Sequence, residues 1–151
     1  KVRKKDKHED LRLYTKSNRD KGRDIDKNPS VCMSVVWNNM ERQVIIKGTA
    51  EKIAEKLSDG YFESRPLGSQ LGAVVSDQSE VVPSREVLEK ALKDLEKAYE
   101  GKEVERPTHW GGYLVRPISI EFWQGRPNRL HDRIRYTLQE DYDWKIERLA
   151  P

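Results

Sequence analysis

Alternation of apolar and polar residues predicts three strands in the first third of the chain. Residues 11–15, Leu-Arg-Leu-Tyr-Thr, alternate in the way that is typical of a half-buried strand. Two β-branched runs, 31–37 and 42–48, are joined by Asn-Asn-Met-Glu, which has the length and composition of a hairpin loop. Residues 18–22 form a polar segment with Gly, and 26–29 end in Pro, so we expect turns there and no helix.

Helical periodicity appears in the middle of the chain. From Ala50 onward, apolar residues recur at helical spacing up to a stop at Pro66. The clearest helix spans 85–100, where Ser84 is suited to be the N-cap and six apolar residues form one stripe that we expect to pack in the core. These residues are Leu88, Ala91, Leu92, Leu95, Ala98 and Tyr99.

The end of the chain is rich in predicted strands. We expect four of them, at 112–115, 118–123, 132–137 and 142–148, the last with Tyr142, Trp144 and Ile146 on one face. With the three earlier strands this makes about seven, against two or three helices. Because several strands follow one another without an intervening helix, a mainly β fold, an antiparallel barrel with peripheral helices, is favoured over a doubly wound sheet.

Length and charge limit the classes of protein that fit. A chain of 151 residues is the size of one compact domain, and its 36% charged residues indicate a large solvated surface or a core completed by a partner. The net charge of +3 is concentrated in residues 1–30, which hold eleven Lys and Arg against six Asp and Glu. Because those acidic residues are interleaved with the basic ones, nucleic-acid binding is disfavoured.

Cysteine use and hydropathy indicate a cytoplasmic, reducing environment. Cys32 is the only cysteine and lies in an apolar run, so we expect a small buried hydrophobe and no disulfide. No apolar stretch approaches the roughly 18 residues that span a bilayer, so no membrane association is expected. The chain begins with Lys1 instead of Met, and we expect it to be a fragment of something longer.

The sequence motifs argue against a metal site and leave phosphate binding open. The three histidines, His8, His109 and His131, are too far apart for a local pair of metal ligands, so we expect no metal. What remains is cations beside small hydroxyl or amide residues, a combination that suits phosphate binding. Tyr61 and Arg65 would share one helix face, with Ser69 just beyond the helix end, although a solvated helix terminus explains this set at least as well.

The strongest candidate site lies at 121–133. An apolar strand ends at Trp123, the chain turns, and Arg129, His131 and Arg133 then occupy alternate positions, which share a face in an extended chain. Two guanidinium groups and an imidazole beside an indole would suit a flat, anionic ligand. From the residues alone, a strand of structural ion pairs is an equally good interpretation.

Several segments of the chain closely resemble the pyridoxamine 5′-phosphate oxidase family. The longest are Glu-Phe-Trp-Gln-Gly-x-x-Asn-Arg-Leu-His-Asp-Arg at 121–133 and Ser-Arg-Pro-x-x-Ser-Gln-x-Gly-Ala-Val-Val-Ser-x-Gln-Ser at 64–79. Glu-Arg-Leu-Ala-Pro at 147–151, Trp-Gly-Gly-Tyr at 110–113 and Asn-Pro at 28–29 match in the same order and spacing. The resemblance covers nearly the whole chain but not the family's N-terminal segment.

The resemblance implies a fold, a reaction and an assembly. The fold would be an FMN-binding split β-barrel, one domain over 1–151 that works as a homodimer with FMN at the subunit interface. Residues 108–151 would form its C-terminal dimerisation and substrate-covering part. The protein would be a flavoprotein oxidoreductase of vitamin B6 metabolism, converting pyridoxamine 5′-phosphate or pyridoxine 5′-phosphate to pyridoxal 5′-phosphate with O2 as acceptor and H2O2 as product.

The resemblance also implies site residues, position by position. The substrate phosphate would be held by Lys4, Tyr61, Arg65 and Ser69. Arg129 and His131 would be the catalytic pair that covers and orients the substrate ring, with Leu130 between them. The flavin-contacting positions would be Tyr14, Thr15, Lys21, Gln43, Gln78, Ser79, Trp123 and Arg133.

One departure from the family pattern leaves two alternatives open. Asp20 stands where the family has an Arg that meets the FMN phosphate, and like charge there should weaken cofactor binding unless Arg19 compensates. The chain could therefore be a non-catalytic homologue that binds pyridoxal 5′-phosphate or serves as a dimer scaffold. It could also act on another ring substrate, such as a phenazine precursor, although the set of Tyr61, Arg65 and Ser69 argues against that.

Overall fold

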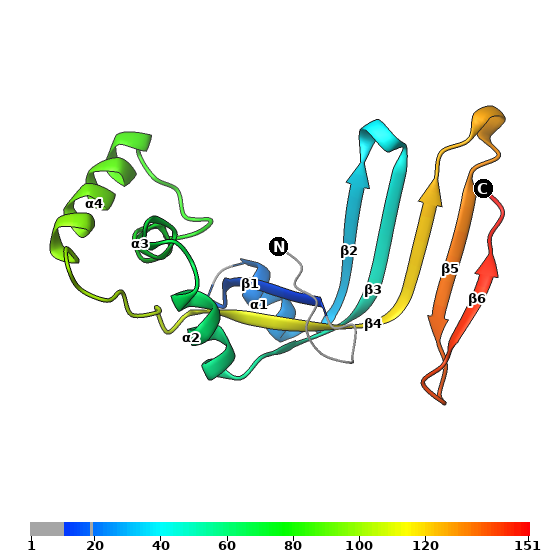
Figure 1. Ribbon diagram of the computed structural model, residues 1–151, viewed down its shortest axis with the longest axis horizontal. Helices are drawn as coiled ribbons and strands as arrows, with labels where there is room; N and C mark the ends of the chain where they lie inside the picture. Colours follow the sequence, from blue (N-terminus) through cyan, green and yellow to red (C-terminus); the bar gives the residue numbers. More distant parts are fainter. Residues whose placement is uncertain (1–10, 19) are drawn as a thin grey trace. The chain divides into compact units, whose positions relative to one another are not determined.

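The computed structural model describes residues 11–18 and 20–151, and the six strands of these residues form one sheet (Figure 1). The strand order is β2-β3-β4-β5-β6, and β1 pairs with β4. The strands are β1 (Leu11–Lys16), β2 (Ser30–Trp37), β3 (Arg42–Lys52), β4 (Trp110–Gln124), β5 (Asp132–Leu138) and β6 (Trp144–Arg148). The helices are α1 (Asp20–Lys27), α2 (Glu55–Glu63), α3 (Leu67–Val75) and α4 (Arg85–Ala98), with the short 3-10 turns η1 (Asn38–Met40) and η2 (Pro127–Arg129).

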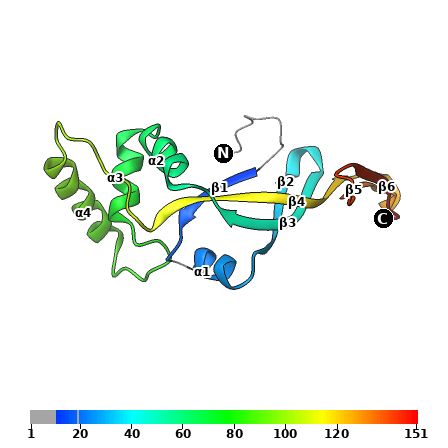
Figure 2. The ribbon, with the colours of Figure 1, turned by 90° about the horizontal axis from the view of Figure 1, so that it is seen from below.

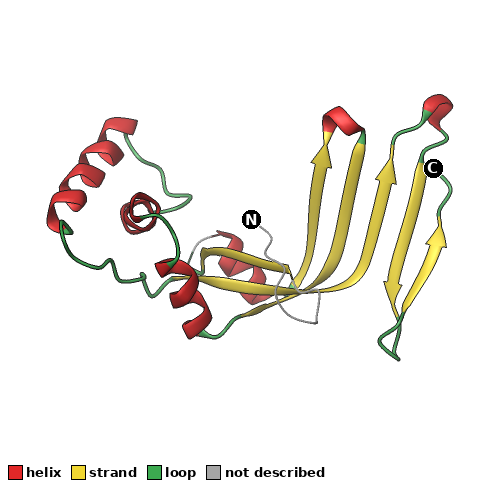
Figure 3. Ribbon diagram, in the orientation of Figure 1, coloured by secondary structure: helices red, strands yellow, loops and turns green. Residues whose placement is uncertain are grey.

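The chain divides into two compact units. The sheet unit contains Asn28–Glu51 and Leu114–Pro151 together with Leu11, and the helical unit contains Arg12–Lys27 and Lys52–Tyr113. Figure 3 distinguishes the helices, in red, from the strands, in yellow. The predominance of antiparallel strands with a few helices confirms the predicted fold class.

The prediction of a turn at 18–22 was wrong, because helix α1 begins at Asp20. Only Gly22 and Ile25 are buried in this helix, so it carries too few apolar residues to show a period. A Cβ at Gly22 would lie 2.3 Å from the carbonyl oxygen of Ser17, so the glycine lets α1 pack against the chain that follows β1. The prediction that no helix continues through Pro29 is confirmed, since α1 ends at Lys27.

Strand β3 runs further than expected, and the helix after it starts later. The backbone N–H of Ala50 donates to the carbonyl of Pro29 at 2.8 Å, which keeps residue 50 in the sheet. Helix α2 therefore begins at Glu55 and not near Ala50. Pro66 separates α2 from α3 as the stop signal predicted.

The two strands predicted at 112–115 and 118–123 are one strand, β4, of 15 residues. Pro117, which separates the two predicted segments, lies inside it. At this point β3 comes very close to β4, since a Cβ at Gly48 would lie 2.2 Å from the carbonyl oxygen of Arg116. The contact exists because Gly48 has no side chain.

The register of β4, β5 and β6 gives this part of the sheet two different faces. Ile120 lies opposite Tyr136, which lies opposite Ile146, whereas Glu121 lies opposite Arg135, which lies opposite Glu147. Since side chains alternate along a strand, one face is apolar and the other charged. The apolar face consists of Ile118, Ile120, Phe122, Ile134, Tyr136, Leu138, Trp144 and Ile146. The charged face includes Glu121, Trp123, Arg133, Arg135, Lys145 and Glu147.

Much of the apolar face is open to solvent. Ile118 is 52% exposed, Phe122 46% and Ile146 60%. Tyr142 does not share this face, contrary to prediction, because it lies in the turn before β6 with a φ of 66°. A sheet surface with this many exposed apolar side chains suits a contact with another molecule.

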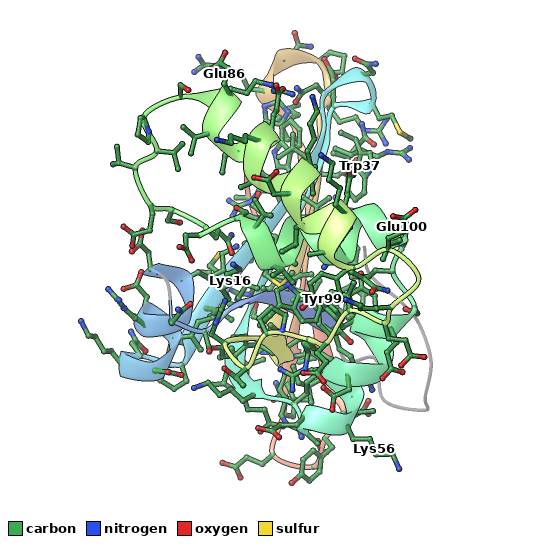
Figure 4. All side chains as sticks on the ribbon, turned by 90° about the vertical axis from the view of Figure 1, so that its left-hand side faces the viewer. Lys16, Trp37, Lys56, Glu86, Tyr99 and Glu100 are labelled. Atoms are coloured by element: carbon green, nitrogen blue, oxygen red, sulfur yellow. The ribbon has the colours of Figure 1, made fainter. Side chains whose placement is uncertain are left out.

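The core of the helical unit is small and combines residues of α2, α3, the loop after α4 and the start of β4; Figure 2 shows these elements in green and yellow. It consists of Phe62, Leu71, Val104 and Trp110, which are all buried. Leu92, Leu95 and Tyr99 pack against this core, but the structure buries no residue of α4, so the expected stripe is only half-buried. Glu86 and Tyr99 mark the two ends of the helix in Figure 4.

Two further expectations concern single residues: the N-cap position of Ser84 is confirmed, and the burial of Cys32 is not. Ser84 occupies the N-cap position of α4, but its side chain makes no capping hydrogen bond. It bonds the side chain of Glu86 instead, which lowers the pKa of that carboxyl group. Cys32, expected to be buried, is exposed, because it lies on β2 at the edge of the sheet. Among the described residues, no helix is both long and apolar enough to cross a membrane.

Candidate functional site

In the helical unit, aromatic rings gather around one arginine. Tyr14 of β1 stacks on Tyr61 of α2 with ring centroids 3.8 Å apart, and the ring of Trp110 lies 5.6 Å from that of Tyr14. The guanidinium carbon of Arg65 lies 5.2 Å from the centroid of the Trp110 ring, in a cation–π contact. A predicted cofactor residue, Tyr14, therefore lies beside two predicted substrate residues, Tyr61 and Arg65.

Arg65 holds a polar group that lacks a partner. Its Nη1 is buried and has no hydrogen-bond partner in the described part of the chain. Leaving a buried guanidinium N–H unsatisfied is unfavourable, and an anionic oxygen would satisfy it with a charge-assisted hydrogen bond. The arrangement of these side chains therefore fits a ligand phosphate.

The local geometry around Arg65 differs from the prediction. Helix α2 ends before Arg65, whose backbone N–H donates to the carbonyl of Phe62 at 3.1 Å. Arg65 and Tyr61 are thus not on one helix face, although both lie near the ring of Trp110, at 5.2 Å for the guanidinium carbon and 6.1 Å for the Tyr61 ring. Ser69 lies in the first turn of α3 and is exposed.

Strand β1 also fixes the loop after α3. The hydroxyl of Thr15 donates to Oε1 of Gln78 at 3.3 Å, and Nζ of Lys16 donates to the carbonyl of Ser76. Thr15 and Lys16, the latter labelled in Figure 4, are both buried. Ser79 turns the loop with a φ of 70°. The structure thus brings together three predicted cofactor residues, Thr15, Gln78 and Ser79, and adds Lys16, which no sequence motif indicated.

The remaining residues near the beginning of the chain are less informative. Lys21 lies on α1 and is exposed. Asp20 is the first residue of α1, where a carboxylate interacts favourably with the helix dipole. Lys4 and Arg19 lie outside the described residues.

In the sheet unit, other predicted residues line one cavity of about 370 Å³. The imidazole of His131 lies 4.9 Å from the Trp123 ring, with 46° between the ring planes. Nε2 of Gln43, on the same wall, donates to the hydroxyl of Ser34 at 3.0 Å. Aromatic rings and cations thus surround a space that suits a planar, anionic group. The principal lining residues are Trp37, Arg42, Gln43, Trp123, Arg126 and His131.

Arg129 does not share an extended strand with His131 and Arg133, so that prediction was wrong. Pro127–Arg129 form η2, in which Asn128 and Arg129 both have a φ of 59°, and β5 starts only at Asp132. The alternation argument therefore applies from Asp132 onward. Arg129 and Leu130 are exposed on this turn.

Arg133 is engaged in structural contacts. It lies opposite Trp123 in the sheet, its Nε bonds Glu121 Oε1 at 2.7 Å, and its Nη1 donates to the carbonyl of Ala150 at 3.0 Å. The hydrogen bond to Glu121 raises the pKa of Arg133. Arg133 therefore takes part in an ion pair within the sheet, and its bond to Ala150 ties the last residues to β5.

Sequence reasoning missed the role of Gln124, although the residue belongs to the motif at 121–133. Its Oε1 accepts a hydrogen bond from Nε of Arg42 at 2.6 Å, and its Nε2 donates to the carbonyl of Met40 at 3.2 Å. Gln124 thereby joins the end of β4 to the tip of the β2–β3 hairpin. No periodicity signals such a contact, because the partners lie about eighty residues earlier in the chain.

Comparison with protein families gives two matches that together span most of the chain. The model described as pyridoxamine 5′-phosphate oxidase matches residues 2–98. The model described as the pyridoxine 5′-phosphate oxidase C-terminal dimerisation region matches residues 110–151. The motif residues quoted above fall inside these two ranges.

Curated relatives carry the same name. The pyridoxine/pyridoxamine 5′-phosphate oxidase of Flavobacterium psychrophilum is 62% identical over 144 residues, which are 95% of this chain and 67% of that protein. The enzyme of the same name from Flavobacterium johnsoniae is 62% identical over 138 residues, 91% of this chain and 64% of that protein. The chain spans about two thirds of the length of these relatives.

Solved structures resemble the fold. PhzG from Burkholderia lata 383, in complex with tetrahydrophenazine-1-carboxylic acid, superposes with a TM-score of 0.84 at 28% identity, covering 93% of this chain and 68% of that one. A pyridoxamine 5′-phosphate oxidase-related, FMN-binding protein from Nostoc punctiforme has a TM-score of 0.75 at 15% identity, covering 99% of this chain and 78% of that one. At that identity the second likeness concerns the fold alone.

Proposed function

Because the chain belongs to the pyridoxamine 5′-phosphate oxidase family, we propose that it forms the FMN-binding part of an oxidase that makes pyridoxal 5′-phosphate. The substrates would be pyridoxamine 5′-phosphate and pyridoxine 5′-phosphate, with O2 as the acceptor and H2O2 as the product. The observation that carries this proposal is the buried Nη1 of Arg65, which has no hydrogen-bond partner among the described residues and belongs to a guanidinium that lies over the ring of Trp110. A substrate phosphate would supply the missing acceptor.

The residues present fit FMN as the cofactor. The Oε1 of Gln78 already accepts from Thr15, which leaves the amide nitrogen of Gln78 to donate to a ligand. Trp123 offers an aromatic surface beside Gln43 in the cavity of the sheet unit. FMN, when bound, would supply the hydride acceptor for the reaction.

The protein's own groups would bind and orient the substrate. Arg65, with Tyr61, Ser69 and Lys4, would hold its phosphate. Arg129 and His131 would cover its ring and compensate charge as hydride is lost. The remaining proposed flavin contacts are Tyr14, Thr15, Lys21, Ser79 and Arg133.

We also propose that the protein is a homodimer, a single flavin-binding domain over 1–151 whose part 108–151 dimerises and covers the substrate. Support comes from the exposed apolar face of β4, β5 and β6, which lies inside the range matched by the dimerisation model. A second copy of the chain would cover that face and remove its apolar side chains from water.

A phenazine-type substrate is the second candidate, because PhzG was solved with tetrahydrophenazine-1-carboxylic acid. The vitamin B6 substrate is favoured on two grounds. The identity to PhzG is 28%, against 62% to the two oxidases. Arg65 also offers a partly buried cation for a phosphate, a group that the phenazine ligand does not have.

Flavin loading followed by product analysis tests the proposal. We expect the purified protein to retain FMN after gel filtration, and to form aldehyde and peroxide in equal amounts from pyridoxamine 5′-phosphate. Binding of pyridoxal 5′-phosphate without any flavin uptake would identify the non-catalytic alternative, which the carboxylate of Asp20 motivates. Turnover of a tetrahydrophenazine carboxylate in preference to the B6 phosphates would identify the phenazine alternative.

A further inference from the structure

The turn after β4 is tied to the tip of the β2–β3 hairpin by both side-chain and backbone bonds. Gln124 Oε1 accepts from Arg42, and Gln124 Nε2 donates to the carbonyls of Met40 and Gly125, each at 3.2 Å. The backbone N–H of Gly125 donates to the carbonyl of Glu41 at 2.7 Å. These bonds fix the position of residues 124–126, which we call the QGR turn.

The central residue of the QGR turn must be glycine. A Cβ at Gly125 would lie 2.8 Å from both Cβ and Oε2 of Glu41, and 3.2 Å from the ring of Trp123. Because no side chain fits there, the turn lies directly against the hairpin tip. The backbone of the following residue, Arg126, is therefore held in a defined place.

Arg126 then makes a specific contact with His131. Its backbone N–H donates to Nδ1 of His131 at 3.1 Å, and its Nε bonds Oδ2 of Asp132 at 2.8 Å. A ring nitrogen that accepts a hydrogen bond carries no proton in the neutral imidazole. In the opposite tautomer, two N–H groups would face each other. The contact therefore selects the tautomer with its proton on Nε2.

We propose that Gln124 is a positioning residue that, by anchoring the QGR turn, keeps His131 in the Nε2–H tautomer, so that its ring acts as a hydrogen-bond donor toward the ligand in the cavity. Only the identity of that ligand rests on the proposed function. The tautomer follows from the protein's own groups. Gln124 itself would touch no ligand; it would act through Arg126 and His131.

Nitrogen NMR of the protein without cofactor or substrate tests the proposal directly. The protein would be labelled with ¹⁵N-histidine and recorded at about pH 8, where an ordinary imidazole is largely neutral. The His131→Asn variant identifies the signals of His131 among the three histidines. We expect Nδ1 of His131 at the shift of an unprotonated ring nitrogen and Nε2 at that of a protonated one. A proton on Nδ1 would overturn the proposal.

In the variant Gln124→Ala, His131 should no longer be held in the Nε2–H tautomer. We expect its His131 signals to move toward the averaged values of free histidine in the same buffer. Gln124→Glu keeps an acceptor for Arg42 but loses both amide donors. Its His131 signals should lie between those of the original protein and those of Gln124→Ala. The matched control is Gln139→Ala in the β5–β6 turn, where Nε2 donates to the carbonyl of Thr137 at 2.9 Å; it should leave His131 unchanged. Unshifted His131 signals in a folded Gln124 variant would refute the role of Gln124.

The kcat of the FMN-loaded enzyme tests the role of Gln124 separately from the proposed oxidase function. In the FMN-loaded enzyme, Gln124→Glu should lower kcat by about tenfold, as expected for lost orientation, with unchanged flavin content. Gln139→Ala should retain the original rate. If the protein bound no flavin at all, the proposed function would fail while the NMR result would still stand. An unaltered kcat in Gln124→Glu with a shifted tautomer would show that His131 does not donate through Nε2 during the reaction, and would overturn that part of the proposal.

Discussion

At the scale of single residues, Arg65 has a buried N–H group whose exposure to a bound anion would remove an energetic cost. Its Nη1 is enclosed without a hydrogen-bond partner in the described part of the chain, so it is ready for an anionic acceptor. We expect Arg65→Met to raise the KM for pyridoxamine 5′-phosphate by about 10- to 100-fold, the value of one charge-assisted hydrogen bond, with no loss of bound flavin. Steady-state kinetics and the flavin absorbance of the same samples measure both quantities.

The control for this variant is Arg85→Met on α4, where the arginine is exposed and pairs with Glu89. It removes the same charge from the same unit and should leave KM unchanged. If Arg65→Met binds the substrate as well as the original protein does, Arg65 does not contact the phosphate.

Asp132 gives a prediction for the dependence of stability on pH. Hydrogen bonds from Arg126 and Arg148 lower its pKa in the folded protein. A carboxyl group with a lowered folded-state pKa stabilises the fold above its unfolded pKa, near 3.9 for Asp, and this contribution is lost as the pH falls through the folded value. Asp132→Asn should therefore be less stable at neutral pH, and its stability should fall less steeply below about pH 4. Urea unfolding from neutral to acid pH measures this.

Asp94→Asn, on the exposed side of α4, serves as the control for Asp132. Its stability should follow that of the original protein at every pH. Parallel curves for Asp132→Asn and the original protein would mean that the two arginines contribute nothing through this carboxylate.

Some site residues could be predicted from the sequence, and others could not. Trp123, Gln43 and His131 were predicted from the resemblance to the family, and the structure places all three in the lining of one cavity. The alternation argument failed for Arg129, because Pro127 and Asn128 favour a turn whose left-handed residues end the extended chain. Gln124 and Lys16 act through carbonyl groups far away in sequence, which no local pattern reveals.

At the scale of elements, hydrophobic periodicity located the strands and the longest helix but failed in two situations. Helix α1 was missed because burial of Gly22 and Ile25 alone produces no period. Strand β4 was divided in two because Pro117 normally interrupts a strand, whereas here it lies within one beside Gly48. In both cases close packing against a glycine decides the structure, and such contacts are tertiary.

The contact at Gly48 predicts a large effect from a small substitution. In Gly48→Ala the new methyl group would lie 2.2 Å from the carbonyl oxygen of Arg116, so β3 and β4 would have to separate. We expect a loss of about 1–3 kcal/mol in the free energy of unfolding, measured by urea denaturation.

Gly60→Ala provides the opposite case. Gly60 lies inside helix α2, and a Cβ there would meet nothing within 4 Å. Alanine should stabilise the protein by about 0.5–1 kcal/mol, because it favours the helix and restricts the unfolded chain. Equal effects of the two substitutions on the free energy of unfolding would show that β3 and β4 lie further apart at Gly48 than the structure indicates.

At the scale of the whole molecule, the family and the mainly β fold could be predicted because long motifs preserve both. The grouping of the predicted site residues could not be predicted. Tyr14, Thr15, Tyr61, Arg65, Gln78 and Ser79 belong to the helical unit, and Gln43, Trp123, His131 and Arg133 belong to the sheet unit. Spacing along the chain does not reveal this division, because both units are built from separate segments.

The proposed dimer can be tested on the apolar face. Ile146→Asp places a carboxylate where we expect a partner chain, and should weaken association by about 100-fold, a loss typical of a central interface residue. Sedimentation equilibrium measures the change. Thr137→Asp is the matched control, because Thr137 lies opposite Lys145 on the charged face and should leave association unchanged. Equal dimerisation of both variants and the original protein would place the interface elsewhere.

The apolar face also bears on how the chain reaches its native state. Ile118, Phe122 and Ile146 remain largely exposed in the folded chain, so the proposed dimer would bury them only when a second chain arrives. The last step of assembly would then be bimolecular, and its half-time would lengthen as newly made chains become scarcer. During that interval the sheet would offer chaperones an apolar surface that the proposed dimer would no longer present.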